Sequence, residues 1–301
     1  DEKKFIKILT PTNQYVKAKY SVYNQTISIN PKALLPSTRL KGIKKIASML
    51  YLQSAIQLNN RFIGREGLAQ YNPFLKVLDD SLLINNSSAW MNSIILNRFS
   101  NQWGLDYVHT TNASKTLLNY GIDGRRNREH LVRARYNLTQ QFTLGLSGKL
   151  GKKVFVSQFL ESRSFQIHSK TIEPGITFLF LRNQFRIQSN YKYDIRQNAQ
   201  ALGGEKAIIQ SLLLDVKYNI VSSGSVNLRT TYSSIQFNGN ANSGLGYTIL
   251  DGFQNGRNWL WQAGFEKRIS KSIEMSLEYE GRKPANSPAV HTGRASIRAI
   301  F

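Results

Sequence analysis

The sequence has no cysteine among its 301 residues, which excludes disulfide frameworks, thiolate metal sites and cysteine nucleophiles. It also has no run of about 18 consecutive apolar residues, so a membrane-spanning helix is not expected. Acidic residues are scarce, with 18 Asp and Glu against 40 Lys and Arg and a formal net charge of +22. An excess of this size first suggests nucleic acid or another anionic surface as the partner. Hydrophobic residues, at 41%, are too frequent for a disordered chain.

The chain instead shows alternation of apolar and polar residues with a period of two. Over residues 185–196, one side carries two tyrosines with Phe185, Ile187 and Ile195, and the other carries mostly charged and amide side chains. Only an extended strand separates two such sets onto opposite faces. Strands of this kind are predicted at 89–98, 102–112, 129–138, 141–151, 165–181, 184–196, 206–220, 224–237, 258–268, 272–282 and 293–301.

The lengths of these strands and of their connections indicate the fold class. Long strands joined by short turns at one end and by long polar loops at the other are typical of a transmembrane β-barrel. The long loops are expected at 113–128, 152–164, 197–205, 238–257 and 283–292. Counting N-terminal candidates, we predict an all-β, antiparallel up-and-down barrel of about 14 strands, with about 12 as the fallback. A large soluble β-sandwich is the less favoured alternative.

The end of the chain carries a family resemblance. Phe301, with Ile297 and Ala299 at the alternate positions before it, is similar to the assembly signal that closes the last strand of Gram-negative outer-membrane barrels. Residues 103–107, 112–115 and 120–128 resemble the barrel portion of large outer-membrane proteins of Bacteroidota. The resemblance covers about 46–301, which we take as the barrel, with 1–45 as an N-terminal segment holding possible first strands and a basic linker. It implies location in the bacterial outer membrane and a barrel that closes a longer chain.

Residues that could support catalysis or metal binding are few. The four histidines are His109, His130, His168 and His291, and none of them lies in a metal-binding spacing such as HExxH. His109 and His130 come from strands that neighbour each other, so they could approach. No GxSxG motif marks a serine nucleophile. We therefore expect no enzyme activity, no cofactor and no metal.

The positive charge has two sharp clusters. Arg125, Arg126 and Arg128 form one, and Lys44 and Lys45 belong to the other. Nothing indicates the basic groove with stacking aromatics that single-stranded nucleic acid needs. One interpretation is that both clusters lie in solvated loops. The other is that they bind anionic lipid, including the phosphates of lipopolysaccharide, through charge-assisted hydrogen bonds.

The alternation also assigns charged residues to the barrel lumen. Basic and acidic residues of similar number are expected there, so that cross-strand ion pairs fill a modest interior. The predicted lumen charges are Arg133, Arg135, Arg186, Lys192, Asp194, Asp215, Lys217, Glu266, Arg268 and Arg298. Aromatic girdles at the membrane interfaces are expected from Trp90, Trp103, Trp259, Trp261, Tyr191 and Tyr193.

One loop is unusually apolar. Tyr247, Ile249, Leu250 and Phe253 lie within residues 244–253, which predicts either a segment folded into the lumen or a partner-binding loop. The sequence therefore favours a structural or interaction subunit of an outer-membrane assembly for secretion, protein assembly or uptake, with a largely filled lumen and protein partners. The alternative is a passive, weakly anion-favouring pore for small solutes.

Overall fold

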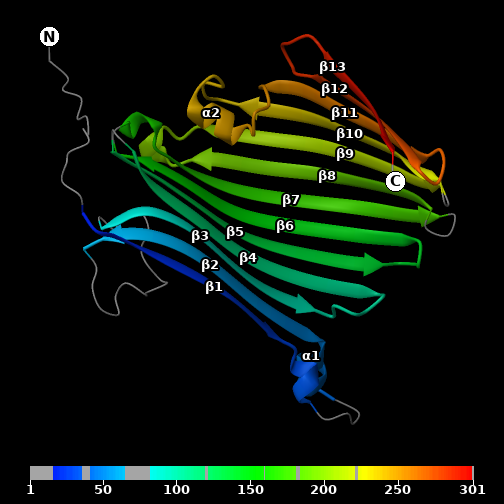
Figure 1. Cartoon of the computed structure of the whole chain (residues 1–301), viewed down its shortest axis with the longest axis horizontal. Helices are drawn as coiled ribbons and strands as arrows, with labels where there is room; N and C mark the ends of the chain where they lie inside the picture. Colours follow the sequence, from blue (N-terminus) through cyan, green and yellow to red (C-terminus); the bar gives the residue numbers. More distant parts are fainter. Residues whose placement is uncertain are drawn as a thin grey trace.

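The structure is a computed structural model that describes residues 16–35, 41–64, 82–118, 121–158, 160–180, 184–220 and 223–299. These residues form one antiparallel sheet of 13 strands, in which each strand pairs with its neighbours in sequence (Figure 1). The strands are β1 (Ala18–Ile29), β2 (Leu50–Ile63), β3 (Leu83–Leu96), β4 (Trp103–Leu118), β5 (Gly121–Asn137), β6 (Phe142–Ser157), β7 (Phe165–Phe180), β8 (Phe185–Asn198), β9 (Lys206–Ile220), β10 (Gly224–Phe237), β11 (Gly256–Arg268), β12 (Ile273–Lys283) and β13 (Val290–Ala299).

The helices are short. They are the 3₁₀ turns η1 (Pro31–Leu34), η3 (Glu161–Arg163) and η4 (Gln200–Leu202), and the α-helices α1 (Ile43–Met49) and α2 (Gly244–Ile249). Figure 1 shows α1 and α2 at opposite ends of the strands. Within the described residues, no helix combines the length and the apolar character needed to cross a membrane.

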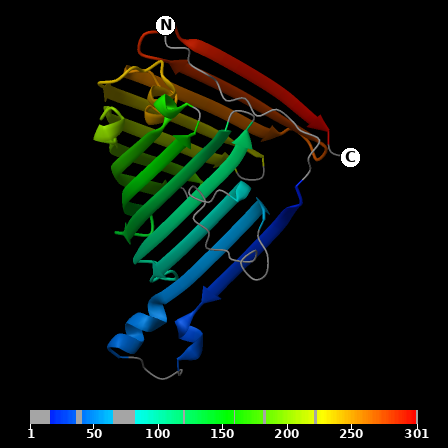
Figure 2. The ribbon, with the colours of Figure 1, turned by 90° about the vertical axis from the view of Figure 1, so that its left-hand side faces the viewer.

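The predicted fold class, an antiparallel up-and-down arrangement of long strands, is confirmed. Figures 1 and 2 show the strands side by side in a strongly curved sheet with β1 and β13 at its edges. Over the described residues the sheet is not closed, because β1 pairs only with β2 and β13 only with β12. The thirteen strands are compatible with the estimate of about fourteen. The apolar residues at 5–9 are a further candidate edge segment by sequence, and they lie outside the described residues.

The two ends of the sheet differ in their connections. The end that carries α1 has connections of three or four residues after β5, β7, β9 and β11, and one of six residues after β3. The other end has connections of six to 18 residues after β6, β8, β10 and β12. We call these the short-turn end and the long-loop end. The long 30–49 connection at the short-turn end is an exception, and so is the β4–β5 connection at the long-loop end.

Two of the expected loops were wrong. Residues 113–118 and 121–128 continue β4 and β5, and β6 runs on to Ser157, so much of 113–128 and part of 152–164 is strand. Both faces are polar at Arg125 and Arg126 of β5, and both are apolar at Val154 and Phe155 of β6, so the apolar–polar alternation disappears although the strands continue. The hydrophobic pattern therefore underestimated these strands.

Cross-strand register defines two faces of the sheet. Residues that pair across strands share a face, and successive residues in a strand face opposite ways. In β7 the even-numbered residues from His168 to Phe178 are exposed, and the odd-numbered residues between them are less so. We call the face that contacts α2 the inner face, and the opposite, largely apolar face the outer face.

The N-terminal strand belongs to the same sheet. β1 lies within residues 1–45 and pairs with β2 in a continuous register from Ala18 opposite Ile63 to Ile29 opposite Leu52. The basic stretch that follows leads into α1, in which Ile43 and Ile46 are exposed.

Candidate functional site

The segment after β10 folds back as α2. Ser243 caps the helix, because its hydroxyl accepts a hydrogen bond of 2.9 Å from the backbone N–H of Gly246. A Cβ at Gly246 would collide with the carbonyl oxygen of Asn240, so this tight turn requires glycine. Asp251 and Gly252 adopt left-handed backbone angles, φ +52° and +79°, which end the helix and return the chain toward β11.

This segment packs on the inner face. The side chains of Ile249 and Leu250 are fully buried, at 0% exposure. They form one cluster with buried apolar residues of β7, β9 and β10, namely Ile167, Ala207, Ile209, Ile235 and Phe237. By contrast, Tyr247 on the same helix is 70% exposed. The helix therefore packs one apolar side against the sheet. Of the two alternatives predicted for residues 244–253, folding inward or binding a partner, the structure shows the first.

A buried arginine fastens the segment to the sheet. Arg196 of β8 donates to the carbonyl oxygen of Ile249 at 2.7 Å and pairs with the carboxylate of Asp251 at 2.6 Å. It also pairs with Asp194 on its own strand at 2.9 Å. The side chains of Arg196 and Asp194 are 8% and 1% exposed. Lys153 of β6 adds a longer contact to Asp251, at 3.8 Å.

The charge of Asp251 is favoured by this environment. Burial is the largest influence and disfavours the ionised carboxylate. The hydrogen bond and charge of Arg196, together with the ammonium groups of Lys153 and Lys192, outweigh it. The pKa of Asp251 is therefore held below its usual value.

Other charges on the inner face are paired across strands. Asp215 of β9 lies between Arg186 of β8 at 2.9 Å and Arg229 of β10 at 2.7 Å. Asp106 of β4 faces Arg133 of β5 at 3.6 Å. By register, every predicted lumen charge lies on this face: Arg133, Arg135, Arg186, Lys192, Asp194, Asp215, Lys217, Glu266, Arg268 and Arg298.

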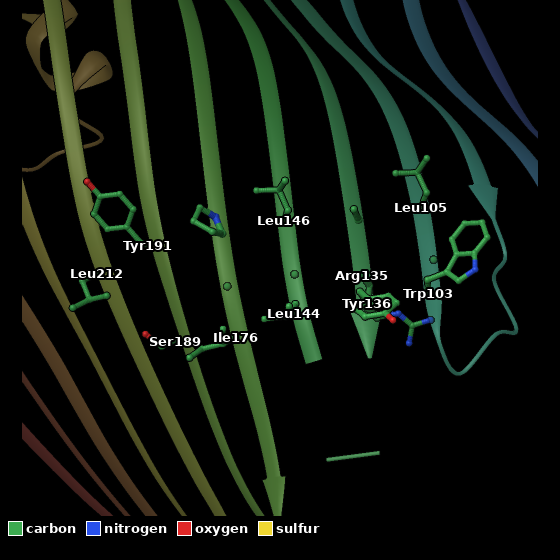
Figure 3. A pocket seen from close by; sticks show the side chains of 15 residues that line it. Trp103, Leu105, Arg135, Tyr136, Leu144, Leu146, Ile176, Ser189, Tyr191 and Leu212 are labelled. Atoms are coloured by element: carbon green, nitrogen blue, oxygen red, sulfur yellow. The ribbon is translucent and has the colours of Figure 1, made fainter. Parts of the chain in front are cut away.

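The outer face is apolar near the short-turn end. A shallow hollow forms where Gly145 of β6 pairs with Gly175 of β7, and aliphatic and aromatic side chains surround it (Figure 3). By register, the predicted interface aromatics Trp90, Trp103, Trp259, Trp261, Tyr191 and Tyr193 all lie on this face. Trp103 begins β4 at the short-turn end, and Trp259 and Trp261 lie toward the long-loop end of β11, whereas the two tyrosines lie in the middle of β8.

The five predicted lipid-contacting basic residues do not form one cluster. Arg126 and Arg128 face outward, but Arg125 faces inward, where its guanidinium lies 5.3 Å from the ring centre of Phe155. Lys44 and Lys45 are in α1, at the other end of the sheet. The run that was expected to be a loop is a strand, and a strand divides neighbouring residues between two faces.

Two of the histidines approach each other, and part of the terminal signal lies in the last strand. The rings of His109 and His130 lie 4.6 Å apart, and the Nδ1 atom of His130 is 2.8 Å from the Tyr107 hydroxyl. The described part of the chain has no group of three or more His, Asp or Glu side chains suited to a metal ion. Ile297 and Ala299 lie in β13, and Phe301 lies outside the described residues.

Comparison with known proteins supports the fold. No family model matches the chain, and a search of curated proteins found no match. Among solved structures, the chain is similar to the ferric-catecholate import receptor Fiu of E. coli K12 in its open form, with a TM-score of 0.50 and 8% identity. The match covers 96% of this chain and 57% of the receptor chain. The fold is that of an outer-membrane β-barrel.

The most buried contacts of the site were missed by sequence reasoning. Arg196 was assigned to the polar side of its strand, but its contact with Asp251 joins residues 55 apart. The apolar residues of 244–253 were a usable signal for burial. No local signal identified which strands would receive them.

Proposed function

We propose that this chain forms the membrane wall of an outer-membrane uptake receptor or assembly whose lumen is closed to free diffusion by residues 244–253. The observation that carries the proposal is the attachment of α2 to the inner face by Ile249, Leu250 and Arg196. Barrels with a plugged interior hold a loop or a helix in the lumen, and α2 is such a segment.

The similarity to an import receptor supports uptake over secretion or protein assembly, the other roles expected from the sequence. The ferric catecholate in the receptor's name is a ligand of that receptor alone. An origin in Bacteroidota, which the short motifs of β4 and β5 indicated, remains part of the same proposal. The chain spans 57% of the length of the receptor chain. Protein partners are also proposed, as for a subunit of an outer-membrane assembly.

Planar-bilayer conductance of the purified chain tests closure of the lumen. We expect the wild-type protein to show no large, steady conductance. The double variant Ile249→Ser, Leu250→Ser removes the buried apolar contacts of α2, and we expect frequent, long openings from it. Tyr247→Ser is the matched control, because Tyr247 lies on the same helix but is exposed, and it should behave as wild type.

A wild-type protein that conducts steadily would overturn this proposal. In that case the alternative, a weakly anion-favouring pore for small solutes, would be the better description. Reversal potentials in a salt gradient would then measure its preference for anions. Co-purification from mild detergent with stoichiometric partners would separately support membership of an assembly.

A further inference from the structure

The outer face carries charges of one sign. All acidic residues in the described strands lie on the inner face by register: Asp106, Asp123, Glu129, Glu173, Asp194, Asp215, Glu266, Glu274, Glu278 and Glu280. Basic residues, by contrast, occur on the outer face of these strands: Arg126 and Arg128 on β5, Lys152 on β6 and Lys170 on β7. We call these four residues, with His168, the outer basic patch.

Lys152 is at the centre of this patch. It pairs directly with Arg128 on β5 and with His168 on β7. Arg126 and Lys170 occupy the diagonal positions on the same two strands. Directly opposed side chains in a sheet lie about 5 Å apart at Cβ, and diagonal neighbours about 7–8 Å apart. Like charges at such positions repel, so the arrangement destabilises the sheet unless an anion lies between them.

No carboxylate of the described chain supplies that anion. Within the described residues, Arg126, Arg128, Lys152 and Lys170 make no ion pair within 4.0 Å. Arg128 and Lys170 are exposed, and Arg126 and Lys152 are half-buried. The inner face of the same strands behaves differently, because Lys153, next to Lys152, contacts Asp251.

The height of the patch along the strand points to its ligand. On β6 the outward residues from Phe142 through Leu150 are apolar or glycine, and Lys152 follows them. The ten steps from Phe142 to Lys152 span about 34 Å along the strand. At the usual barrel tilt of about 40°, this is about 26 Å across the membrane, close to the ~25 Å apolar band of outer-membrane barrels. On β7 the apolar outward residues likewise end at Lys170.

The outer basic patch therefore lies at the level of lipid headgroups, at the long-loop end that faces outward in such barrels. Given the outer-membrane location of the proposed function, we propose that it binds the phosphate groups of a phosphorylated outer-leaflet glycolipid of the lipid A type. Arg128 and Lys152 donate charge-assisted hydrogen bonds to one phosphate, and Arg126 and Lys170 flank it. The acyl chains pack on the apolar outward residues below, such as Leu150 and Ile172.

The test compares lipids that differ only in phosphate. The detergent-purified full chain is titrated with bis-phosphorylated lipid A, with the same lipid stripped of phosphate, and with inorganic phosphate, and bound lipid is counted by native mass spectrometry. We expect the phosphorylated lipid to bind at least tenfold more tightly than the stripped lipid, and inorganic phosphate not to compete at millimolar concentration. Equal binding of the two lipids, or displacement by free phosphate, would overturn the proposal.

Two variants locate the binding. Arg128→Gln, Lys152→Gln should lose about tenfold or more in affinity for phosphorylated lipid A. Lys267→Gln, Lys271→Gln removes the same charge at the short-turn end and should bind as wild type. Without lipid A the patch variant should melt at a higher temperature than wild type, because repulsion is relieved, and with saturating lipid A the order should reverse.

This reversal also distinguishes lost lipid binding from a destabilised fold, because a variant with a destabilised fold would melt at a lower temperature than wild type both with and without lipid A. If the order does not reverse, the patch does not hold the lipid. The outcome is independent of conductance: an open wild-type channel would remove the proposed closure of the lumen but leave lipid binding in place.

Discussion

On the inner face Asp215 lies between Arg186 and Arg229, whereas on the outer face Lys152 lies between Arg128 and His168. In the first arrangement one carboxylate pairs with two guanidinium groups across three strands. The second concentrates one sign of charge, and no carboxylate of the described residues pairs with it. The two sites lie on different strands, β8 to β10 and β5 to β7, and whether each charge faces inward or outward follows from its odd or even position in its own strand. The two faces are thus adapted to two media, a polar interior and a lipid boundary.

The largest effect should come from breaking the most buried pair of the inner face. Arg196→Met removes both bonds that Arg196 makes to the 249–251 turn, and it takes from the buried carboxylate of Asp194 its closest cation, leaving it Lys192 at 3.4 Å. Loss of one partner of a buried ion pair costs roughly 3–5 kcal/mol. We expect a fall of this size in the free energy of unfolding by denaturant in detergent micelles, and faster proteolysis within 238–255.

The control for this change is Arg186→Met. Asp215 keeps Arg229 when Arg186 is removed, and the Arg186 side chain is 42% exposed, so the loss should be about 1 kcal/mol or less. Equal losses in the two variants would show that Arg196 has no special role in fastening the segment.

Adjacent residues of β6 test the assignment of the faces. Leu146 faces outward and Ser147 inward, near the middle of the strand. Arginine on a lipid-facing position near the bilayer midplane costs about 2–4 kcal/mol. We expect Leu146→Arg to lose that much unfolding free energy in lipid vesicles and Ser147→Arg to lose little. The reverse result would exchange the two faces.

The smallest effect is a pH dependence of the α2 attachment. The pKa of Asp251 is lowered in the folded state, so its ionised form stabilises the attachment above the unfolded carboxyl pKa of about 3.9. This contribution is lost as the pH falls through the lower, folded value. Proteolysis of 238–255 by pepsin, followed as the pH is lowered below about 4, should accelerate in wild type. Asp251→Asn should already be faster at pH 4 and should change less with further acidification.

The sequence predicted the part of the fold in which one face meets lipid and the other water. Residues 185–196 alternate without interruption, and β8 was found at Phe185–Asn198. The prediction failed at 113–128, where β5 extends beyond the apolar band and presents Arg125 on one face and Arg126 on the other. Hydrophobic alternation marks only the portion of a strand that crosses the lipid. Strands that extend beyond it need long-range pairing to be recognised.

The sequence identified residues of the candidate site but not the contacts between them. Ile249 and Leu250 were recognisable as too apolar for a solvated loop, and Arg196 as a residue of the polar face. Their contact depends on the curvature of β7 to β10, which brings Ile167, Ile209 and Ile235 under the helix. Curvature is a collective property of paired strands, and no single segment encodes it.

The two edge strands determine how this chain must enter a membrane. In the described part, β1 and β13 each present one row of backbone N–H and C=O groups without a strand partner. Hydrocarbon does not supply hydrogen bonds to such groups, so each edge must acquire a neighbouring strand before it is immersed. Hairpins between consecutive strands can form early and locally. A seam in which β1 pairs with β13 would join segments far apart in sequence, and its formation costs the entropy of closing a long loop. We therefore expect formation of the seam to be the slow step of insertion, and substitutions in β1 or β13 to change the insertion rate more than those in β6 or β7.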